Sequence, residues 1–178
     1  MSLSYRFENK DGFTMGYYFQ SLMGLLVRPG SFFEDLPDRG IFGKSLGYLF
    51  LSALFYWLAS LTLVQERYLP LTGISFLNAL AMPVITAWIA FMVMILFPGK
   101  RVKFSGLFSV FAFASGTTLL MAWIPSFIWI TEPWKWILVF KGMVRGCGLR
   151  RLPAFLIIAV TIAVLFILFR SLVQDMPG

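Results

Sequence analysis

Long uncharged stretches alternate with short charged segments along most of this chain. The stretches 45–64, 71–97, 104–131 and 152–169 hold 20, 27, 28 and 18 residues without a charged side chain. Twenty residues at 1.5 Å each make a helix of about 30 Å, which matches the hydrocarbon thickness of a bilayer. The pattern predicts four transmembrane helices, with Pro83 kinking the second, Pro125 ending the third and Pro153 near the first position of the last.

The segment from Glu132 to Arg151 is harder to assign, because Lys135 and Lys141 interrupt its apolar residues. Lys and Arg accumulate on the cytoplasmic side of membrane proteins. With five spans, twelve of the 15 Lys and Arg residues share one side, and only Arg67, Lys135 and Arg170 lie on the other. With four spans the division is nine against six. The charge bias therefore predicts a short fourth span at roughly 133–146, with its two lysines snorkelling to the interfaces.

Before the first span, apolar residues recur at helical spacing between Thr14 and Val27. They are Met15, Tyr18, Phe19, Leu22, Leu25 and Leu26, and Gly16, Gln20 and Gly24 lie elsewhere on the wheel. This spacing predicts an amphipathic helix on the cytoplasmic membrane surface. A break follows at 28–30, and Ser31 and Glu34 match a capping box for a second short helix that ends near Leu36.

The expected fold is therefore all-α, a polytopic bundle of five transmembrane helices preceded by an interfacial amphipathic helix. Its parts are a cytoplasmic N-terminal segment at 1–43, a membrane domain at 44–170 and a short tail at 171–178. The N-terminus is expected in the cytoplasm, without a cleaved signal, and the C-terminus on the opposite side. Trp123, Trp129, Trp134 and Trp136 are expected to form an aromatic belt at the outer interface.

Composition supports the membrane assignment and narrows the chemistry. Hydrophobic residues make up 59% of the chain and charged residues 13%, far from the usage of soluble domains. The net charge of +7 is spread over short clusters between apolar runs, so nucleic acid is not an expected partner. With no histidine and Cys147 as the single cysteine, we expect no disulfide, metal or other cofactor.

Catalysis is not expected either, because the four clear spans hold no acid, base or paired nucleophile. Asn78 is the main amide inside a span, either as an interhelical hydrogen-bond donor or as a ligand contact. The hydroxyl groups of Ser109, Ser115, Thr117 and Thr118 are expected to bond to the preceding helical turn.

Small residues four positions apart allow helices to approach closely, as at Ala112 with Gly116 and Gly142 with Gly146. The predicted interface residues are Arg28, Pro29, Phe32, Phe33, Asn78, Ala112, Gly116, Gly142 and Gly146. Basic loops orient the spans and contact anionic headgroups. The predicted headgroup contacts are Lys100, Arg101, Lys103, Arg145, Arg150 and Arg151.

The order of these parts resembles the Yip domain family, named for Ypt-interacting protein. The segments that carry the resemblance are 25–36 (LLVRPGSFFEDL), 136–142 (WILVFKG) and 149–154 (LRRLPA). The resemblance implies five spans. Within the family, the chain looks more like the bacterial members. The Asp-Leu-Tyr-Gly-Pro motif of eukaryotic members is absent, so their binding of Rab GTPases does not extend to this chain.

These observations predict a non-enzymatic protein of the bacterial inner membrane, a Yip-like scaffold or accessory subunit of a membrane complex. Its expected partners are membrane lipids and either other membrane subunits or further copies of itself. The alternative function is translocation of a lipid or small molecule, for which an apolar cavity and basic loops are sufficient.

Overall fold

The computed structural model describes residues 13–36, 41–62, 69–96 and 101–174, and every regular element in these ranges is helical. Seven α-helices follow one another, with a 3-10 turn at Pro125–Phe127 before the sixth and a π-helical turn at Gly142–Gly146 after it. The α-helices are α1 (Met15–Val27), α2 (Pro29–Glu34), α3 (Ile41–Leu61), α4 (Leu69–Leu96), α5 (Phe104–Ala122), α6 (Ile128–Lys141) and α7 (Arg151–Gln174).

Four helices within the described ranges are long and apolar enough to cross a bilayer, as expected of an integral membrane protein. The candidate spans are Ile41–Leu61, Gly73–Leu96, Phe104–Ala122 and Arg151–Leu168. They correspond to the four uncharged stretches of the sequence. The third span ends at Ala122, close to the predicted end at Pro125, and α4 remains helical through Pro83.

The predicted fourth span corresponds to α6 and the π-helical turn, which together are helical from Ile128 to Gly146. The helix begins five residues before the predicted start, and Pro133 lies inside it rather than at its first position. The α6 helix alone has 14 residues, so it is shorter than the four candidate spans.

Helix α5 forms the centre of the bundle, and its residues 107–118 are buried without interruption. Helix α3 packs along α5 in the same direction. Near the start of both helices, the Ser45 and Ser109 hydroxyl oxygens are 3.0 Å apart. Further along, the Tyr48 and Thr117 hydroxyl oxygens are also 3.0 Å apart. Neither pair contains a charge, so these bonds join the two helices at low desolvation cost.

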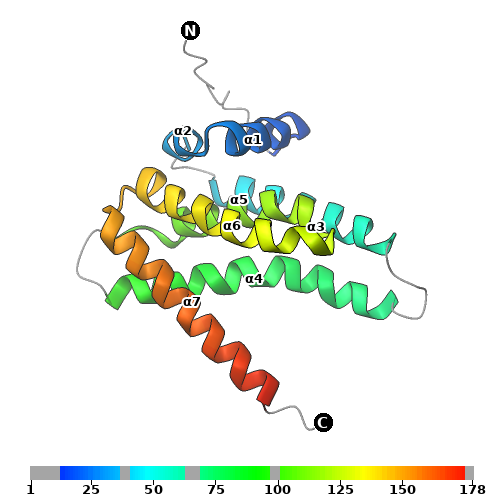
Figure 1. The fold of residues 1–178 in the computed structure, drawn as a ribbon. Coiled ribbons are helices and arrows are strands. Elements are labelled where there is room, and N and C mark those ends of the chain that lie inside the picture. Colours follow the sequence, from blue (N-terminus) through cyan, green and yellow to red (C-terminus); the bar gives the residue numbers. More distant parts are fainter. Residues whose placement is uncertain (1–12, 37–40, 63–68, 97–100, 175–178) are drawn as a thin grey trace.

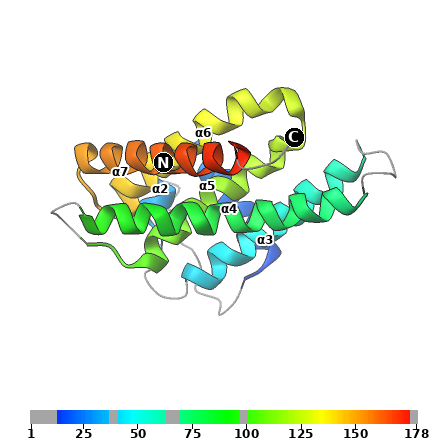
Figure 2. The same cartoon turned by 90° about the horizontal axis from the view of Figure 1, so that it is seen from below.

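Helix α6 runs in the opposite direction to α5, since Trp136 contacts Phe111 while the later Gly142 lies against Val110. Helix α4 covers the lower side of this layer in Figure 1, where α7 descends obliquely past α4; in Figure 2 the two helices run side by side. Helix α6 therefore packs as one of the main helices of the bundle despite its short length.

Helices α1 and α2 lie over the side of α3 and α5 that faces away from α4 (Figure 1). The Tyr18 hydroxyl is 3.1 Å from that of Ser52, and the Phe32 and Phe113 ring centroids are 5.1 Å apart. Ser52 is about 16 Å along α3 from its first residue, at 1.5 Å per residue. The contacts of α1 and α2 thus reach well beyond the ends of the bundle helices.

The apolar face predicted for α1 is divided in the structure. Tyr18 and Leu25 are buried against the bundle, whereas Met15, Phe19 and Leu26 are exposed on the other side. Met23 and Val27 are also exposed. Both the packed and the exposed side of α1 are therefore largely apolar, which differs from a helix with one apolar and one polar face.

The predicted capping box is wrong in position. Helix α2 starts at Pro29, with Arg28 as its N-cap, so Ser31 is already in the first turn. The Ser31 hydroxyl donates to the Arg28 carbonyl oxygen at 3.0 Å. Proline suits the first helical position because the missing N–H has no partner there, and this preference decides the boundary.

Candidate functional site

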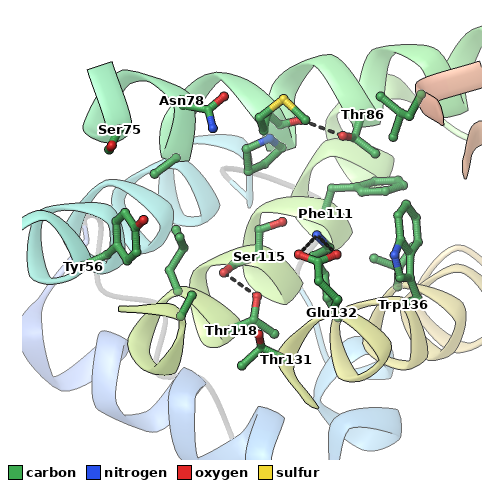
Figure 3. Close-up of a pocket in the computed structure, with 18 residues that line it drawn as sticks. Tyr56, Ser75, Asn78, Thr86, Phe111, Ser115, Thr118, Thr131, Glu132 and Trp136 are labelled. Carbon is green, nitrogen blue, oxygen red and sulfur yellow. Dashed lines mark hydrogen bonds and ion pairs between the residues drawn. The ribbon is translucent and has the colours of Figure 1, made fainter. Parts of the chain in front are cut away.

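A cavity of about 380 Å³ opens between α4, α5 and α6, with further walls from Tyr56 of α3 and Leu165 of α7. Figure 3 shows side chains from the three main helices converging on it. The polar residues that line the cavity are Tyr56, Ser75, Asn78, Thr86, Ser115, Thr118, Thr131, Glu132, Lys135 and Trp136. This volume is within the range of small-molecule sites, about 300–1,000 Å³.

Each main helix contributes one face to the cavity. On α5 the lining positions are 111, 115, 118, 119 and 122, which are three or four residues apart. On α4 they run from 75 through 78, 79, 82 and 83 to 86, and on α6 they are 131, 132, 135, 136 and 139. Residues at these spacings lie on one side of a helix, so three regular helices are sufficient to build the site.

An ion pair lies in this lining. The Lys135 ammonium nitrogen is 2.7 Å from each carboxylate oxygen of Glu132, three residues earlier on α6. The Lys135 side chain is 23% exposed and that of Glu132 is 53% exposed, so the carboxylate is the more accessible partner. The ammonium group also lies 5.5 Å from the centroid of the Trp136 ring. In the structure Lys135 pairs with Glu132, and its snorkelling to the interface stays a prediction.

Glu132 and Lys135 are the only charged side chains among the described residues that line the cavity. Their charges cancel, so the site has no net charge. In a region of low dielectric, paired charges cost much less than isolated ones. The site can therefore present a strong donor and a strong acceptor without a net electrostatic penalty.

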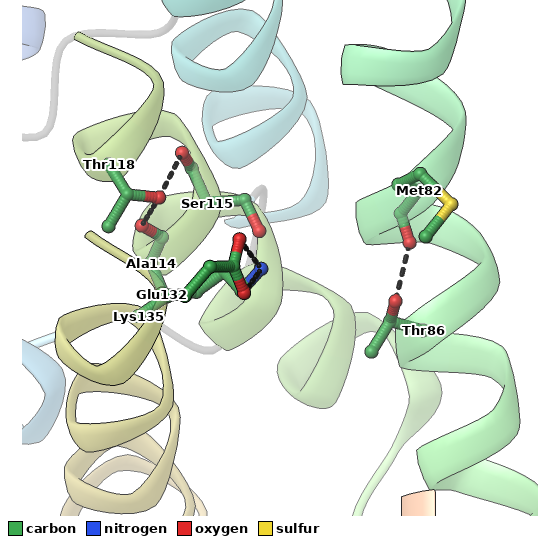
Figure 4. A network of polar contacts seen from close by, with 7 residues as sticks. All are labelled: Met82, Thr86, Ala114, Ser115, Thr118, Glu132 and Lys135. Atoms are coloured by element: carbon green, nitrogen blue, oxygen red, sulfur yellow. Dashed lines mark hydrogen bonds and ion pairs between the residues drawn. The ribbon is translucent and has the colours of Figure 1, made fainter. Parts of the chain in front are cut away.

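Hydroxyl groups beside the pair bond mainly to their own helices, as Figure 4 shows for two of them. Thr118 donates to the Ser115 carbonyl oxygen at 3.0 Å, and Thr86 donates to that of Met82 at 2.7 Å. Such bonds were predicted for four residues of α5. They are confirmed for Ser109, Thr117 and Thr118, each of which donates to the carbonyl four residues earlier. The Ser115 hydroxyl group instead lines the cavity beside the ion pair (Figure 4).

Asn78 lies on the cavity wall and its side chain is exposed. Among the described residues it makes no side-chain hydrogen bond of the interhelical kind that was the first expectation. Its position fits the alternative, a contact with a ligand. The amide supplies both a donor and an acceptor to the wall that faces the ion pair across the cavity (Figure 3).

The other predicted interface residues contact one another within the chain. A Cβ atom at Gly142 would lie 2.5 Å from a methyl carbon of Val110, and one at Gly146 would lie 3.0 Å from the Phe33 carbonyl oxygen. At Gly116 the close neighbour is Tyr48, at 2.8 Å. Pro29, Phe32, Phe33 and Ala112 are buried, and Arg28 is exposed. The small residues therefore serve contacts between α2, α3, α5 and α6.

The predicted headgroup contacts gather at the opposite end of the bundle from the ion pair. A groove of about 300 Å³ there brings together Ile41, Arg101, Lys103 and Gly146. Arg145 lies beside it and forms an ion pair of 2.6 Å with Glu34. Arg101, Lys103, Arg145, Arg150 and Arg151 are all exposed, and Lys100 lies outside the described residues.

No family model, curated protein or solved structure matches this chain. The Yip resemblance therefore stays a prediction.

The ion pair was not predicted as a site from the sequence, because Glu132 and Lys135 were treated as loop and interface charges. A signal was present, since opposite charges three residues apart meet on one face of a helix. The sequence alone did not indicate that this face of α6 is turned toward the polar faces of α4 and α5.

Proposed function

We propose that this chain is a five-span inner-membrane protein that binds the polar headgroup of a membrane-borne amphiphile in the cavity between α4, α5 and α6. The observation that carries the proposal is the ion pair of Glu132 and Lys135, which lies in a cavity walled by hydroxyl and amide groups within an otherwise apolar bundle. A polar lining of this kind replaces the water that a headgroup loses when it moves between helices. The protein would act in lipid or small-molecule translocation, without a catalytic step.

The arrangement of the cavity suits an amphiphile. Ser75, Asn78 and Glu132 lie toward the end of the bundle where α4 begins and α5 ends, whereas Phe111, Val139 and Leu165 line the more apolar part, where Thr86 adds one hydroxyl group. The lining of α4 extends from 75 to 86, about 16 Å at 1.5 Å per residue. A headgroup at the polar end and the first part of an acyl chain along the apolar part would satisfy both kinds of surface.

The proposed topology places the N-terminus and the basic loops in the cytoplasm. It is supported by the grouping of Ile41, Arg101, Lys103 and Gly146 around one groove, and by the reversal of direction between α5 and α6. Under this topology the cavity faces the outer half of the membrane. The assignment to a bacterial inner membrane rests on the Yip resemblance alone.

The scaffold or accessory subunit remains the second candidate. It was favoured on sequence by Phe32, Phe33 and the Gly142–Gly146 pair as surfaces for another subunit. In the structure these residues contact each other and α5, so they do not form an open docking surface. A Yip-like scaffold would then need a different surface, such as the exposed apolar side of α1.

The test is the retention of lipid by protein purified in mild detergent, measured by native mass spectrometry, together with lipid scrambling in liposomes. The double variant Asn78→Leu, Thr86→Val removes two polar groups from the cavity wall. We expect about a fivefold or greater loss of bound lipid, since one hydrogen bond contributes about 1 kcal/mol. Thr161→Val is the matched control, because Thr161 makes the same 2.7 Å bond to its own helix but is not in the cavity. Equal retention by the double variant and the control would contradict the proposal.

A further inference from the structure

The charges and accessibility of the ion pair also indicate which headgroup the cavity accepts. We infer that the ligand is a zwitterion with a phosphate and a primary ammonium group, as in a phosphoethanolamine headgroup. This inference rests on the proposed function and adds the chemical class of the ligand.

The net charge of the site favours a neutral headgroup. Glu132 and Lys135 cancel each other, and the described lining contains no other charge. A headgroup with a net charge would bring a charge without a partner into this neutral site. A zwitterion keeps the complex neutral, so it is favoured over an anionic headgroup such as phosphoglycerol.

Both charged groups of the pair can bind a ligand. The Glu132 carboxylate is 53% exposed and has lone pairs beyond those directed at Lys135, so it can accept hydrogen bonds from an ammonium group. Lys135 has three N–H donors, and its ammonium nitrogen lies at 2.7 Å from both Glu132 oxygens. A proton not directed at Glu132 can bind a phosphate oxygen. Each charge of the pair thus has a complementary partner in the zwitterion, at the strength of a charge-assisted hydrogen bond.

The surroundings of the ion pair suit a primary rather than a quaternary ammonium group. Quaternary ammonium groups are held by aromatic rings that surround them, because they donate no hydrogen bonds. Here Phe111 and Trp136 lie edge to face, with centroids 6.5 Å apart, and the Lys135 ammonium already faces the Trp136 ring at 5.5 Å. This arrangement is not a cage, whereas the accessible carboxylate suits a group with N–H donors.

The experiment is a competition among phosphatidylethanolamine, phosphatidylcholine and phosphatidylglycerol, presented in equal amounts to the full-length protein and measured by native mass spectrometry. Wild-type protein should retain phosphatidylethanolamine in preference to the other two. Glu132→Gln leaves the site with one positive charge, and the preference should shift about tenfold toward phosphatidylglycerol, the scale of one charge-assisted hydrogen bond. Lys135→Gln leaves one negative charge, and it should lower phosphatidylglycerol binding most.

Two further variants separate charge recognition from loss of structure. The double exchange Glu132→Lys, Lys135→Glu keeps the site neutral and should restore the preference for phosphatidylethanolamine. Thr161→Val removes a buried hydroxyl group outside the cavity, keeps both charges of the pair, and should leave lipid selection unchanged. If the protein binds lipid without headgroup preference, or if the preference ignores both charge variants, the inference is overturned while the proposed function stands. If wild-type protein binds none of the three lipids, the proposed function fails as well.

Discussion

Individual glycines set the closest approaches in this bundle. Gly142 and Gly146 form a notch on the π-helical turn after α6, and Phe33 of α2 fills it. The sequence indicated close helix packing at this Gly-x-x-x-Gly pair and associated it with an interface. In the structure the contact is made by α2 of the same chain, because Pro29 starts a short helix that directs Phe33 back to the bundle.

A methyl group added at this notch should destabilise the protein. In Gly142→Ala the new Cβ would lie 2.5 Å from a Val110 methyl carbon, and Val110 is β-branched and buried. Overpacking of this kind costs about 1–3 kcal/mol. Thermal unfolding in one detergent should show a lower midpoint for the variant. Gly43→Ala is the matched control, because no atom lies within 4 Å of its added Cβ, and it should be neutral or stabilising. A Gly142→Ala midpoint equal to that of the control would contradict the tight fit.

At the scale of helices, α1 is the element whose environment differs most from expectation. No residue from Met15 to Val27 is charged, and the side turned away from the bundle exposes Met15, Phe19, Met23 and Leu26. Backbone groups at both ends of α1 have hydrogen-bond partners nearby. The Thr14 hydroxyl caps the first turn, and the Arg28 N–H donates to the Gly24 carbonyl oxygen. Gln20 is the one strongly polar side chain exposed on α1, and an uncharged helix with a largely apolar exposed side is stable against hydrocarbon.

We therefore predict that the exposed side of α1 contacts lipid chains below the headgroups. A nitroxide attached at Phe19→Cys in a Cys147→Ser background can be measured by its collisions with oxygen and with a water-soluble nickel complex. Oxygen collisions should dominate, as at Phe50→Cys on the exposed side of α3, whereas the nickel complex should dominate at Arg101→Cys. Strong collisions with the nickel complex at position 19 would show that α1 lies at the membrane surface, as predicted from the sequence. Weak collisions with both reagents would mean that another protein covers this side.

For the whole molecule, the relation between α5, α6 and α7 decides the sidedness of the C-terminus. Helix α6 is too short and too charged to be recognised as a span by itself, yet it packs against α5 in the opposite direction. It also brings Arg145 to the end of the bundle where Arg101 and Lys103 lie. An odd number of spans follows if α6 crosses the membrane with its neighbours.

A reporter protein that is active only in the cytoplasm tests this number of spans. Fused after Gly178 of the full chain, it should be inactive, because five spans place the C-terminus opposite the N-terminus. Fused after Lys103, before α5, it should be active and serve as the control. An active C-terminal fusion would mean an even number of spans, and α6 would then not cross the membrane.

The uncharged stretches were sufficient to predict the four long helices, because length and apolarity act locally along the chain. The start of α6 was predicted five residues too late, since Pro133 was taken as a helix start. The structure shows that the turn at Pro125–Phe127 leads directly into the helix, where one proline removes only one hydrogen bond. Element boundaries thus depend on what precedes them as well as on the residue itself.

The order of residues was enough to establish which segments are helical, which are apolar enough for a bilayer, and that the spans lack isolated charges. The packing of the helices was needed to show that Phe33 fills the glycine notch, that α1 exposes large apolar side chains away from the bundle, and that the faces of α4, α5 and α6 enclose one cavity around the Glu132–Lys135 pair. Helix formation depends on interactions between residues only three and four positions apart. Tyr48 and Thr117, by contrast, are 69 positions apart, and Glu34 and Arg145 are 111 apart. Contacts over such separations depend on how whole helices pack, and this is a property of shape that no local pattern encodes.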